Sequence, residues 1–494
     1  MGPSRGAGND VLVGGTGIDS ITAAAGNDTV TAGAGNDTIV FAANFTTGDS
    51  VDGGDGTDTL SLTTAALTTL SALSISAGTA LNTALSNVER LSISNAFDVG
   101  AAFDLARLDS INHVTLVAGT TGAEELSGLA ANSTIVIGDT SSLTATLADA
   151  TGSADIINFN LIDQDGTASA ETITAITASN IETVNIAATE ATAAAAVVTY
   201  TITTLSAKST AQVNFTGTES VTVTTATSLR NVDGSGLTAG NLTISVANAS
   251  SAATVVGGAG ADVLTGSTNS DSMTGGAGAD SINGGALNDT IDGGAGSDTA
   301  HYGGTGIDSI TGGAGSDSIA GGAGNDVIVL TETTALTDSI YIGASDTGGT
   351  NEAIGATNID TITGFTAGTG GDLLVFDDGA VDVTSATQKV ATLSSDGATL
   401  TSLANTAVAG DVDVLVVLGT FGTYAAVQVI LNATAGTITD ATDGAIVVWT
   451  DDDGDTQVYY DTNISAGAGT GTQMAVLTGV AVENLVAANF DVIA

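Results

Sequence analysis

Residues 257–329 read GGAGADVLT, GSTNSDSMT, GGAGADSIN, GGALNDTID, GGAGSDTAH, then the single residue Tyr302, then GGTGIDSIT, GGAGSDSIA and GGAGNDVIV. In these eight nine-residue units the sixth residue is always Asp, and the eighth is Leu, Met or Ile in seven of the eight. A flexible linker rich in Gly and Asp would not keep this register. The period therefore predicts a repeated structural unit that stacks on its neighbours.

Each unit combines a turn with a short strand. Glycine at the first, second and fourth positions permits left-handed backbone and a close approach of chain segments, which a Cβ atom would prevent. The last three residues, with an apolar residue in the middle, suit a short strand with one inward side chain. Two units would form one coil of a flattened helix, and successive coils would pair as parallel strands. The predicted fold is all-β, a parallel β-roll or β-solenoid.

Stacking of the coils would bring the sixth-position Asp of each unit beside the Asp of the unit two along. Two carboxylates that close repel by roughly 3–4 kcal/mol at an effective dielectric constant near 20, so a row of them requires cations. Calcium fits, because it is a hard ion that takes carboxylate and carbonyl oxygens as ligands. We expect multiple Ca²⁺ ions, with these aspartates as ligands: Asp10, Asp19, Asp28, Asp37, Asp58, Asp262, Asp271, Asp280, Asp289, Asp298, Asp308, Asp317 and Asp326.

The first five of these aspartates belong to a shorter block that opens the chain and to a detached unit, GGDGTDTLS, at 53–61. Some units are irregular, and we expect their turns to bind calcium weakly or only to hold the register. The irregular positions are Leu287 in place of Gly, residues 266–271 with only the first Gly, Ala300 as a poor core residue, and three alanines at 23–25.

The segment between the two blocks is rich in Thr, Ala and Val and alternates as strands do. A looser unit recurs in it, in which an acid precedes a strand: NVERLSI at 87–93, NIETVNI at 180–186 and TESVTV at 218–223. These strands are either ordinary strands or stacked rungs of a β-solenoid, and we favour the solenoid. A calcium role for Glu89, Glu182 and Glu219 is the less favoured interpretation.

The last segment is expected to contain strands joined by acidic loops. The apolar runs 446–449 and 457–460 flank Asp451–Asp455, which predicts a hairpin with a Gly turn. Its carboxylates could hold another calcium ion, but an acidic solvated turn is the commoner arrangement. The predicted segments are N-terminal calcium-binding repeats at 6–61, a β-rich solenoid-like segment at 62–256, the main β-roll at 257–330 and a C-terminal β-rich domain at 331–494.

The composition excludes several classes of partner and site. The chain has 54 Asp and Glu against 6 Lys and Arg, a formal net charge of −48, and this repels nucleic acid and anionic membranes. It has no Cys for disulfides or thiolate metal sites, and two His are too few for a three-histidine zinc site. No apolar run approaches the roughly 18 residues that span a bilayer, and no N-terminal signal peptide is evident. The start, with the lone Pro3, looks like the cut end of a longer chain.

The nonapeptides together with the segments between them resemble the RTX S-layer proteins of Caulobacter-type bacteria, and more broadly the type I secreted RTX proteins. The segments that carry the resemblance beyond the nonapeptides are GDSVDGGDGTDTLSL at 48–62 followed by NVERLSI, ADIINFNL at 154–161, NIETVNIAAT at 180–189, VDGSGL at 232–237 and IDTITGF at 359–365. The resemblance covers most of the chain and corresponds to the lattice-forming, C-terminal part of such proteins.

The resemblance implies secretion through a type I channel, directed by an uncleaved C-terminal signal that here ends in DVIA at 491–494. It implies folding outside the cell, where calcium is abundant, and assembly with further copies of the chain through calcium bridges. One departure is notable. S-layer proteins of this type carry an N-terminal helical domain that binds lipopolysaccharide, and nothing before residue 6 could do that. Either the chain is the lattice half of a longer protein, with lipopolysaccharide bound through a region not present here, or it attaches differently, or it is not an S-layer subunit.

Three functions are weighed. We favour a structural S-layer protein that forms a calcium-dependent two-dimensional lattice on the cell surface. The alternative is a secreted adhesin or biofilm-matrix protein, and a secretion module of an RTX hydrolase is less favoured. The chain lacks H-E-x-x-H and G-x-S-x-G motifs. His301 is interpreted as an outward strand residue and His113 as a solvated residue before a strand, so we expect no enzymatic activity.

Overall fold

The chain forms two compact units, residues 1–250 and 251–494, each built almost entirely of β-strands. The prediction of an all-β, parallel β-roll is confirmed. The N-terminal five residues and Ala494 lie outside the described residues. The computed structural model describes residues 6–71, 85–100, 102–108, 111–116, 118–138, 141–148, 152, 154–163, 170–189, 197–330, 336–342, 359–377, 390–393, 400–402, 414–421, 423–427, 445–461 and 471–493.

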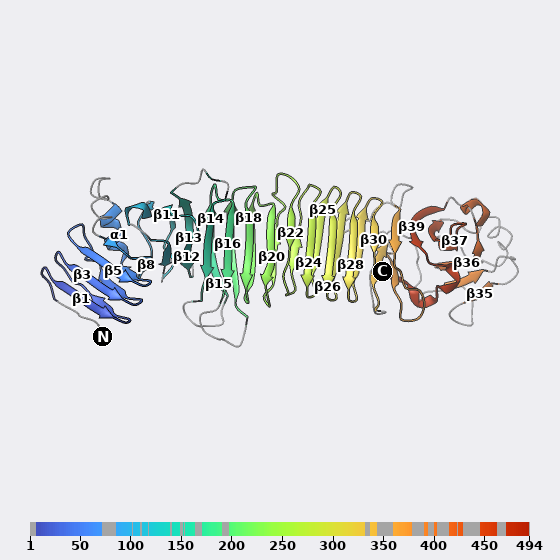
Figure 1. Ribbon diagram of the computed structural model, residues 1–494. Helices are drawn as coiled ribbons and strands as arrows, with labels where there is room; N and C mark the ends of the chain where they lie inside the picture. Colours follow the sequence, from blue (N-terminus) through green and yellow to red (C-terminus); the bar gives the residue numbers. More distant parts are fainter. Residues whose placement is uncertain are drawn as a thin grey trace. The chain divides into compact units, whose positions relative to one another are not determined.

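In the first unit, consecutive strands alternate between stacks of parallel strands (Figure 1). One stack contains, in order, β2 (Ser20–Thr22), β4 (Thr38–Ala42), β6 (Thr59–Leu62), β8 (Arg90–Ile93), β10 (His113–Leu116), β12 (Ser133–Ile137), β14 (Ile156–Leu161), β16 (Thr183–Ala188), β18 (Gln212–Gly217) and β20 (Asn231–Leu237). The other face begins with β1 (Val11–Thr16), β3 (Thr29–Ala34), β5 (Ser50–Asp55) and β7 (Leu85–Ser86). It continues as a separate sheet of β9 (Phe103–Asp104), β11 (Ala123–Leu129), β13 (Ser142–Leu147), β15 (Glu171–Ala178), β17 (Thr199–Ala207), β19 (Ser220–Thr227) and β21 (Leu242–Ser245).

The second unit has the same alternation. One parallel stack contains β22 (Thr254–Val256), β24 (Ser272–Ala277), β26 (Thr290–Ala295), β28 (Ser309–Ala314), β30 (Val327–Val329), β32 (Asp360–Thr363) and β39 (Thr472–Thr478). The facing stack contains β23 (Val263–Thr265), β25 (Ser281–Ala286), β27 (Ala300–Thr305), β29 (Ser318–Ala323), β31 (Ser339–Ile342), β33 (Leu373–Asp377) and β40 (Phe490–Ile493). Both stacks are parallel throughout, as the nine-residue period predicts.

Beyond β39 the sheet becomes mixed. The strands β37 (Ala445–Thr450) and β38 (Thr456–Asp461) form the antiparallel hairpin that the sequence predicts, with Trp449 aligned to Gln457. The same sheet continues through β36 (Val414–Thr420), β34 (Val390–Leu393) and β35 (Leu400–Ser402), and short 3₁₀ turns at Val482–Asn484 and Ala487–Asn489 precede β40.

Aligned aliphatic side chains form the core of the stacks. In the second unit these are Met273, Ile291, Ile310, Ile328 and Ile362, each at most 1% exposed. Each such side chain contributes about 1.5–3 kcal/mol when it leaves water. Coil length varies around this constant core, from 18 residues between Asp271 and Asp289 to 34 between Asp326 and Asp360. In the segment between the two repeat blocks, the even-numbered strands from β8 to β20 each pair in parallel with the next one in the stack, which confirms the stacked rungs expected there.

Two details differ from the sequence-based expectation. The sequence predicted only strands in the segment 62–256, but Thr64–Ser71 form the helix α1, which buries Ala66, Leu67 and Leu70. In the irregular repeat of β27, the register aligns His301, not Ala300, with the inward residues Ile282 and Ile319. The extra residue therefore precedes His301 in the backbone register, and the interpretation of His301 as an outward residue stays a prediction. Among the described residues, no helix is long and apolar enough to span a bilayer.

Candidate calcium sites

The acids of the main repeat block are joined into two ladders. In each step the backbone N–H of one residue donates to the Oδ1 atom of the Asp one coil later, over 2.7–3.0 Å. One ladder runs from Ala253 through Asp271, Asp289, Asp308 and Asp326 to Asp360, and the other from Asp262 through Asp280, Asp298, Asp317 and Asp338 to Asp372. The sixth-position acids thus lie beside those two units along, as the stacking argument requires.

In much of the main block the second carboxylate oxygen is available to a cation, whereas the Oδ2 atoms of Asp262 and Asp271 accept the backbone N–H of Gly258 and Ser267. The Oδ2 atoms of Asp280, Asp289 and Asp326 are buried and accept no hydrogen bond. The first-position glycine of each repeat leaves a space beside this atom. A Cβ added at Gly284 would lie 2.5 Å from Oδ2 of Asp289 and 2.7 Å from the carbonyl oxygen of Gly303. A carboxylate and a carbonyl from consecutive coils therefore converge on a space too small for a methyl group, and both are oxygen donors of the kind calcium prefers.

Burial makes these carboxylates costly to ionise without a counterion. It raises the pKa of Asp280 to about 6 and the pKa values of Asp289 and Asp298 to about 7. The N–H donated to each carboxylate offsets part of this rise in pKa, and the neighbouring carboxylates of the ladder add to it. A divalent cation placed among them would remove the penalty, so the residues fit calcium. When bound, the ion would supply charge neutralisation and tie one coil to the next.

The N-terminal block has the same construction. Its ladders run from Asp10 through Asp28 to Asp49, and from Asp19 through Asp37 and Asp58 to Glu89, with N–H to carboxylate distances of 2.8–2.9 Å. The carboxylates of Asp28, Asp37 and Asp58 are buried, and the Oδ2 atom of each lacks a hydrogen-bond partner. Asp10 and Asp19, at the free edge, are half-buried. All thirteen predicted ligands thus occupy ladder positions, and their calcium ligation stays a prediction.

The sequence analysis did not identify Asp49, Asp338, Asp360 and Asp372, which continue the ladders beyond the nonapeptides. Each begins the pattern acid–x–aliphatic–x, such as DSIY at 338–341, and none follows a complete G-G-x-G-x turn, although Gly368 and Gly370 hold the second and fourth turn positions before Asp372. This acid–x–aliphatic–x pattern is the feature of the sequence from which these four ladder acids could have been predicted. Asp49 and Asp372 close their ladders differently, because their Oδ2 atoms accept the backbone N–H of Thr46 at 2.7 Å and of Thr366 at 2.6 Å.

The irregular repeats keep their places in the ladders. Leu287 keeps a positive φ, but its value of 67° differs from the 128–149° of the glycines at the same position in five other repeats. Asp271, whose turn retains only its first glycine, is 3% exposed and accepts the N–H of Ala253. The loss of a glycine therefore changes the turn without removing the acid from its register.

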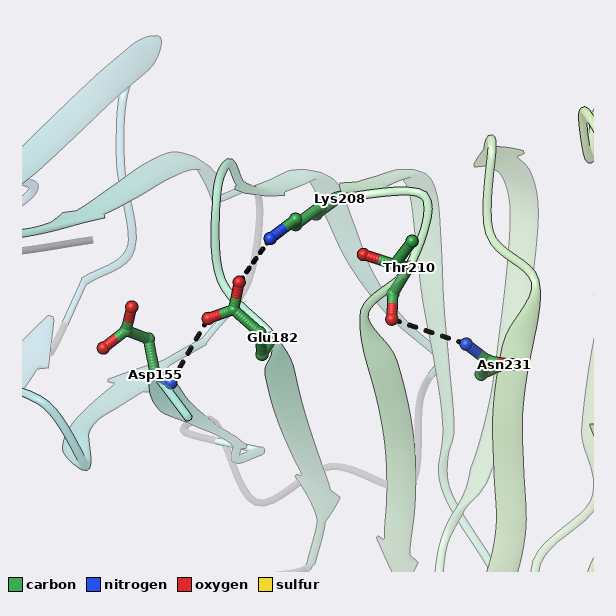
Figure 2. Close-up of polar contacts among 5 residues, drawn as sticks. All are labelled: Asp155, Glu182, Lys208, Thr210 and Asn231. Carbon is green, nitrogen blue, oxygen red and sulfur yellow. Dashed lines mark hydrogen bonds and ion pairs between the residues drawn. The ribbon is translucent and has the colours of Figure 1, made fainter. Parts of the chain in front are cut away.

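The three glutamates of the looser unit lie at the corresponding position of their coils. Glu89, Glu182 and Glu219 accept the backbone N–H of Asp58, Asp155 and Val198, respectively. Figure 2 shows the second of these, where the Lys208 ammonium also pairs with Glu182. The hydrogen bond from Lys208, more than any other contact, lowers the pKa of Glu182. At Glu182, therefore, the positive charge beside the ladder carboxylate comes from a lysine of the chain itself.

The acidic hairpin at Asp451–Asp455 has a different arrangement. The Asp451 carboxylate accepts the backbone N–H groups of Asp453 and Asp455 and the Gln457 amide, and Asp455 accepts the N–H of Gly479. These bonds favour a solvated turn stabilised by its own acids. No three His, Cys, Asp or Glu side chains among the described residues gather closely enough to hold an ion, so the ladder sites depend on paired acids and main-chain carbonyls.

Comparison with known families agrees with this geometry. The model of the RTX calcium-binding nonapeptide repeat matches the chain in four copies, at residues 5–39, 252–282, 265–300 and 302–330. These stretches are calcium-binding repeats, and they contain the ladder acids from Asp10 to Asp37 and from Asp262 to Asp326, whereas the ladders themselves extend further at their C-terminal ends. A comparison with curated proteins gives no match.

Proposed function

We propose that this chain is a structural S-layer subunit, secreted and folded by calcium outside the cell, that assembles with further copies of itself into a two-dimensional lattice. The observation that carries the calcium-dependent part is the set of buried ladder carboxylates, such as Asp280 and Asp289, whose Oδ2 atoms face a carbonyl-lined space. The role proposed is structural, with no catalytic step.

Secretion before folding is consistent with the calcium requirement. Calcium sites of extracellular modules have dissociation constants near 10⁻⁴–10⁻³ M, so they fill outside cells and stay empty in the cytoplasm. A chain with a formal charge of −48 would then gain most of its folding stability only when it meets calcium. RTX repeat proteins are typically secreted, which supports the type I route proposed from the C-terminal tail.

Lattice formation is supported by the resemblance of the segments between the repeats to S-layer proteins and by the surface charge. Subunits so acidic repel one another at short range, and a divalent ion between facing acids would convert that repulsion into a contact.

Electron microscopy of the purified protein tests the proposal. Samples in millimolar calcium, in millimolar magnesium, in chelator, and in chelator with high sodium chloride should show ordered sheets only with calcium. If the protein instead forms monodisperse particles in calcium that bind cells or polysaccharide, the result would contradict the lattice and favour the adhesin function. Folding that ignores calcium would overturn both.

A further inference from the structure

The N-terminal ladder continues past the nonapeptides into a coil of another kind. The last nonapeptide of this block, at 53–61, is followed by β8, which pairs in parallel with β6 so that Thr59 is aligned to Arg90. This register places Glu89 beside Asp58, and the Asp58 N–H donates to Glu89 Oε2 at 2.9 Å. Glu89 therefore takes the position that an Asp holds elsewhere, one coil beyond the last nonapeptide of the block.

A buried oxygen without a partner faces this boundary. Asp58 is 0% exposed, and its Oδ2 atom accepts no hydrogen bond. A Cβ added at Gly53 would lie 2.7 Å from that Oδ2 atom and would collide with the carbonyl oxygen of Asn87. Asn87 is held in place by its own side chain, which donates to Asp52 Oδ1 at 2.7 Å. The space beside Gly53 is thus lined by a carboxylate oxygen and a carbonyl oxygen from two successive coils.

The coil of Glu182 shows how the same position is neutralised elsewhere. Asp155 donates its N–H to Glu182 Oε2 at 3.3 Å, just as Asp58 does to Glu89, and Asp155 is 8% exposed. There the Lys208 ammonium pairs with Glu182 Oε1 (Figure 2). Among the described residues no Lys or Arg makes an ion pair with Glu89. The two coils share the N–H to glutamate bond and a buried Asp Oδ2 atom that accepts no hydrogen bond, and they differ in that a Lys pairs with the glutamate of the second coil.

We propose that Glu89 completes a calcium site with the Asp58 carboxylate and the Asn87 carbonyl, and that Lys208 takes the place of the ion at the equivalent position of Glu182. The site would lie outside the stretches that match the nonapeptide repeat, which end at residue 39 in this part of the chain. It uses oxygen donors only, as a hard divalent cation requires. The ion would tie the N-terminal roll to the first coil of the β-solenoid that follows it.

Native mass spectrometry of the full chain at saturating calcium tests this by counting bound ions. Glu89→Gln keeps an oxygen that accepts the Asp58 N–H but removes the charge, and it should bind one ion fewer than the wild-type chain. Glu182→Gln is the matched control and should keep the full number, because its cation is Lys208. Glu89→Asp, which restores the acid used in the rest of the ladder, should recover the lost ion.

An unchanged number of ions in Glu89→Gln would overturn the site, and so would an ion lost equally from Glu89→Gln and Glu89→Asp. Loss of an ion from Glu182→Gln would overturn the substitution by Lys208. Far-UV circular dichroism in calcium shows whether each variant is folded before its ions are counted. A wild-type chain that binds no calcium would instead contradict the proposed function, so the two failures are distinguishable.

Discussion

The backbone N–H of Asp280 donates to Oδ1 of Asp298 at 2.7 Å, and both residues are at most 1% exposed. Each ladder acid therefore serves two purposes. Its Oδ1 atom satisfies the main chain of an earlier coil, while the rest of the carboxylate faces the space that an ion would fill. A substitution that preserves the first purpose and removes the second isolates the role of the ion.

Asp280→Asn is such a substitution, because the amide oxygen still accepts the N–H of Asp262. We expect the calcium concentration at the folding midpoint to rise about tenfold, which corresponds to about 1.4 kcal/mol. Asp292→Asn removes an equal charge from an exposed position of the same block, and because its charge acts on Asp298 only through space, it should shift the midpoint much less. Calcium titrations followed by far-UV circular dichroism provide the comparison, and equal shifts in both variants would assign the effect to net charge alone.

The pH dependence of stability should reverse with calcium. Burial raises the pKa values of Asp289 and Asp298 in the ion-free protein to about 7, against an ordinary value near 3.8. The stability contributed by a raised carboxyl pKa is present in full below about pH 3.8 and is lost as the pH rises through about 7. In calcium-depleted buffer the melting temperature should therefore be higher at pH 5 than at pH 8.

With calcium present the order should be the opposite, because protons and calcium compete for the same oxygens. Thermal melts at both pH values, with and without the ion, check the sign. A melting temperature that rises with pH in calcium-depleted buffer would show that the ladder acids are neutralised by something other than protons or calcium.

The sequence was sufficient for the architecture where the period is strict. Nine-residue spacing fixes which residues face inward and which acids stack, because a parallel roll repeats its geometry with each coil. It did not reveal how far the ladders extend. Asp338, Asp360 and Asp372 follow loops of irregular length, and coil length is not constrained once the glycine turns end. Only the three-dimensional pairing shows that such acids return to the same column.

The same reasoning explains the smaller differences. The helix α1 is short, and it is rich in Thr and Ala as the neighbouring strands are, so its composition does not distinguish it from a strand. The register of His301 depends on where one inserted residue is accommodated, and either Ala300 or His301 was compatible with the spacing. Lys208 meets Glu182 across 26 residues, a separation with no period to reveal it.

Position in the ladder should determine the cost of losing an acid. Asp317→Ala removes the acceptor of the Asp298 N–H and leaves a buried donor unpaired, which costs about 1–3 kcal/mol in addition to the lost ion contact. Asp10→Ala keeps its own N–H bond to Asp28, and Asp10 is half-buried at a free edge. The midpoint of calcium-induced folding should therefore shift more for Asp317→Ala. Equal midpoints would contradict a cooperative ladder.

Assembly should depend on exposed acids of the 451–455 hairpin that do not stabilise the turn. Asp452 and Asp453 have exposed side chains, whereas Asp451 accepts two backbone N–H groups of the hairpin. On the proposed lattice mechanism, the double variant Asp452→Ser with Asp453→Ser should fold normally in calcium yet form no sheets. Asp451→Ser is the contrasting variant, because it should loosen the hairpin itself and alter the fluorescence of the single tryptophan, Trp449, in the adjacent strand.

Salt dependence separates a calcium bridge from simple screening in this assembly. Physiological salt screens exposed charges beyond about 8 Å, so it weakens repulsion between subunits but supplies no ligand-bound ion between facing carboxylates. Sodium chloride with chelator should therefore fail to produce sheets, while calcium at the same ionic strength should succeed. Electron microscopy and sedimentation of the wild-type chain and the double variant provide the readout. Sheets from the double variant in calcium would place the bridges at other acids, and sheets from the wild type in salt and chelator would assign the contacts to apolar surface instead.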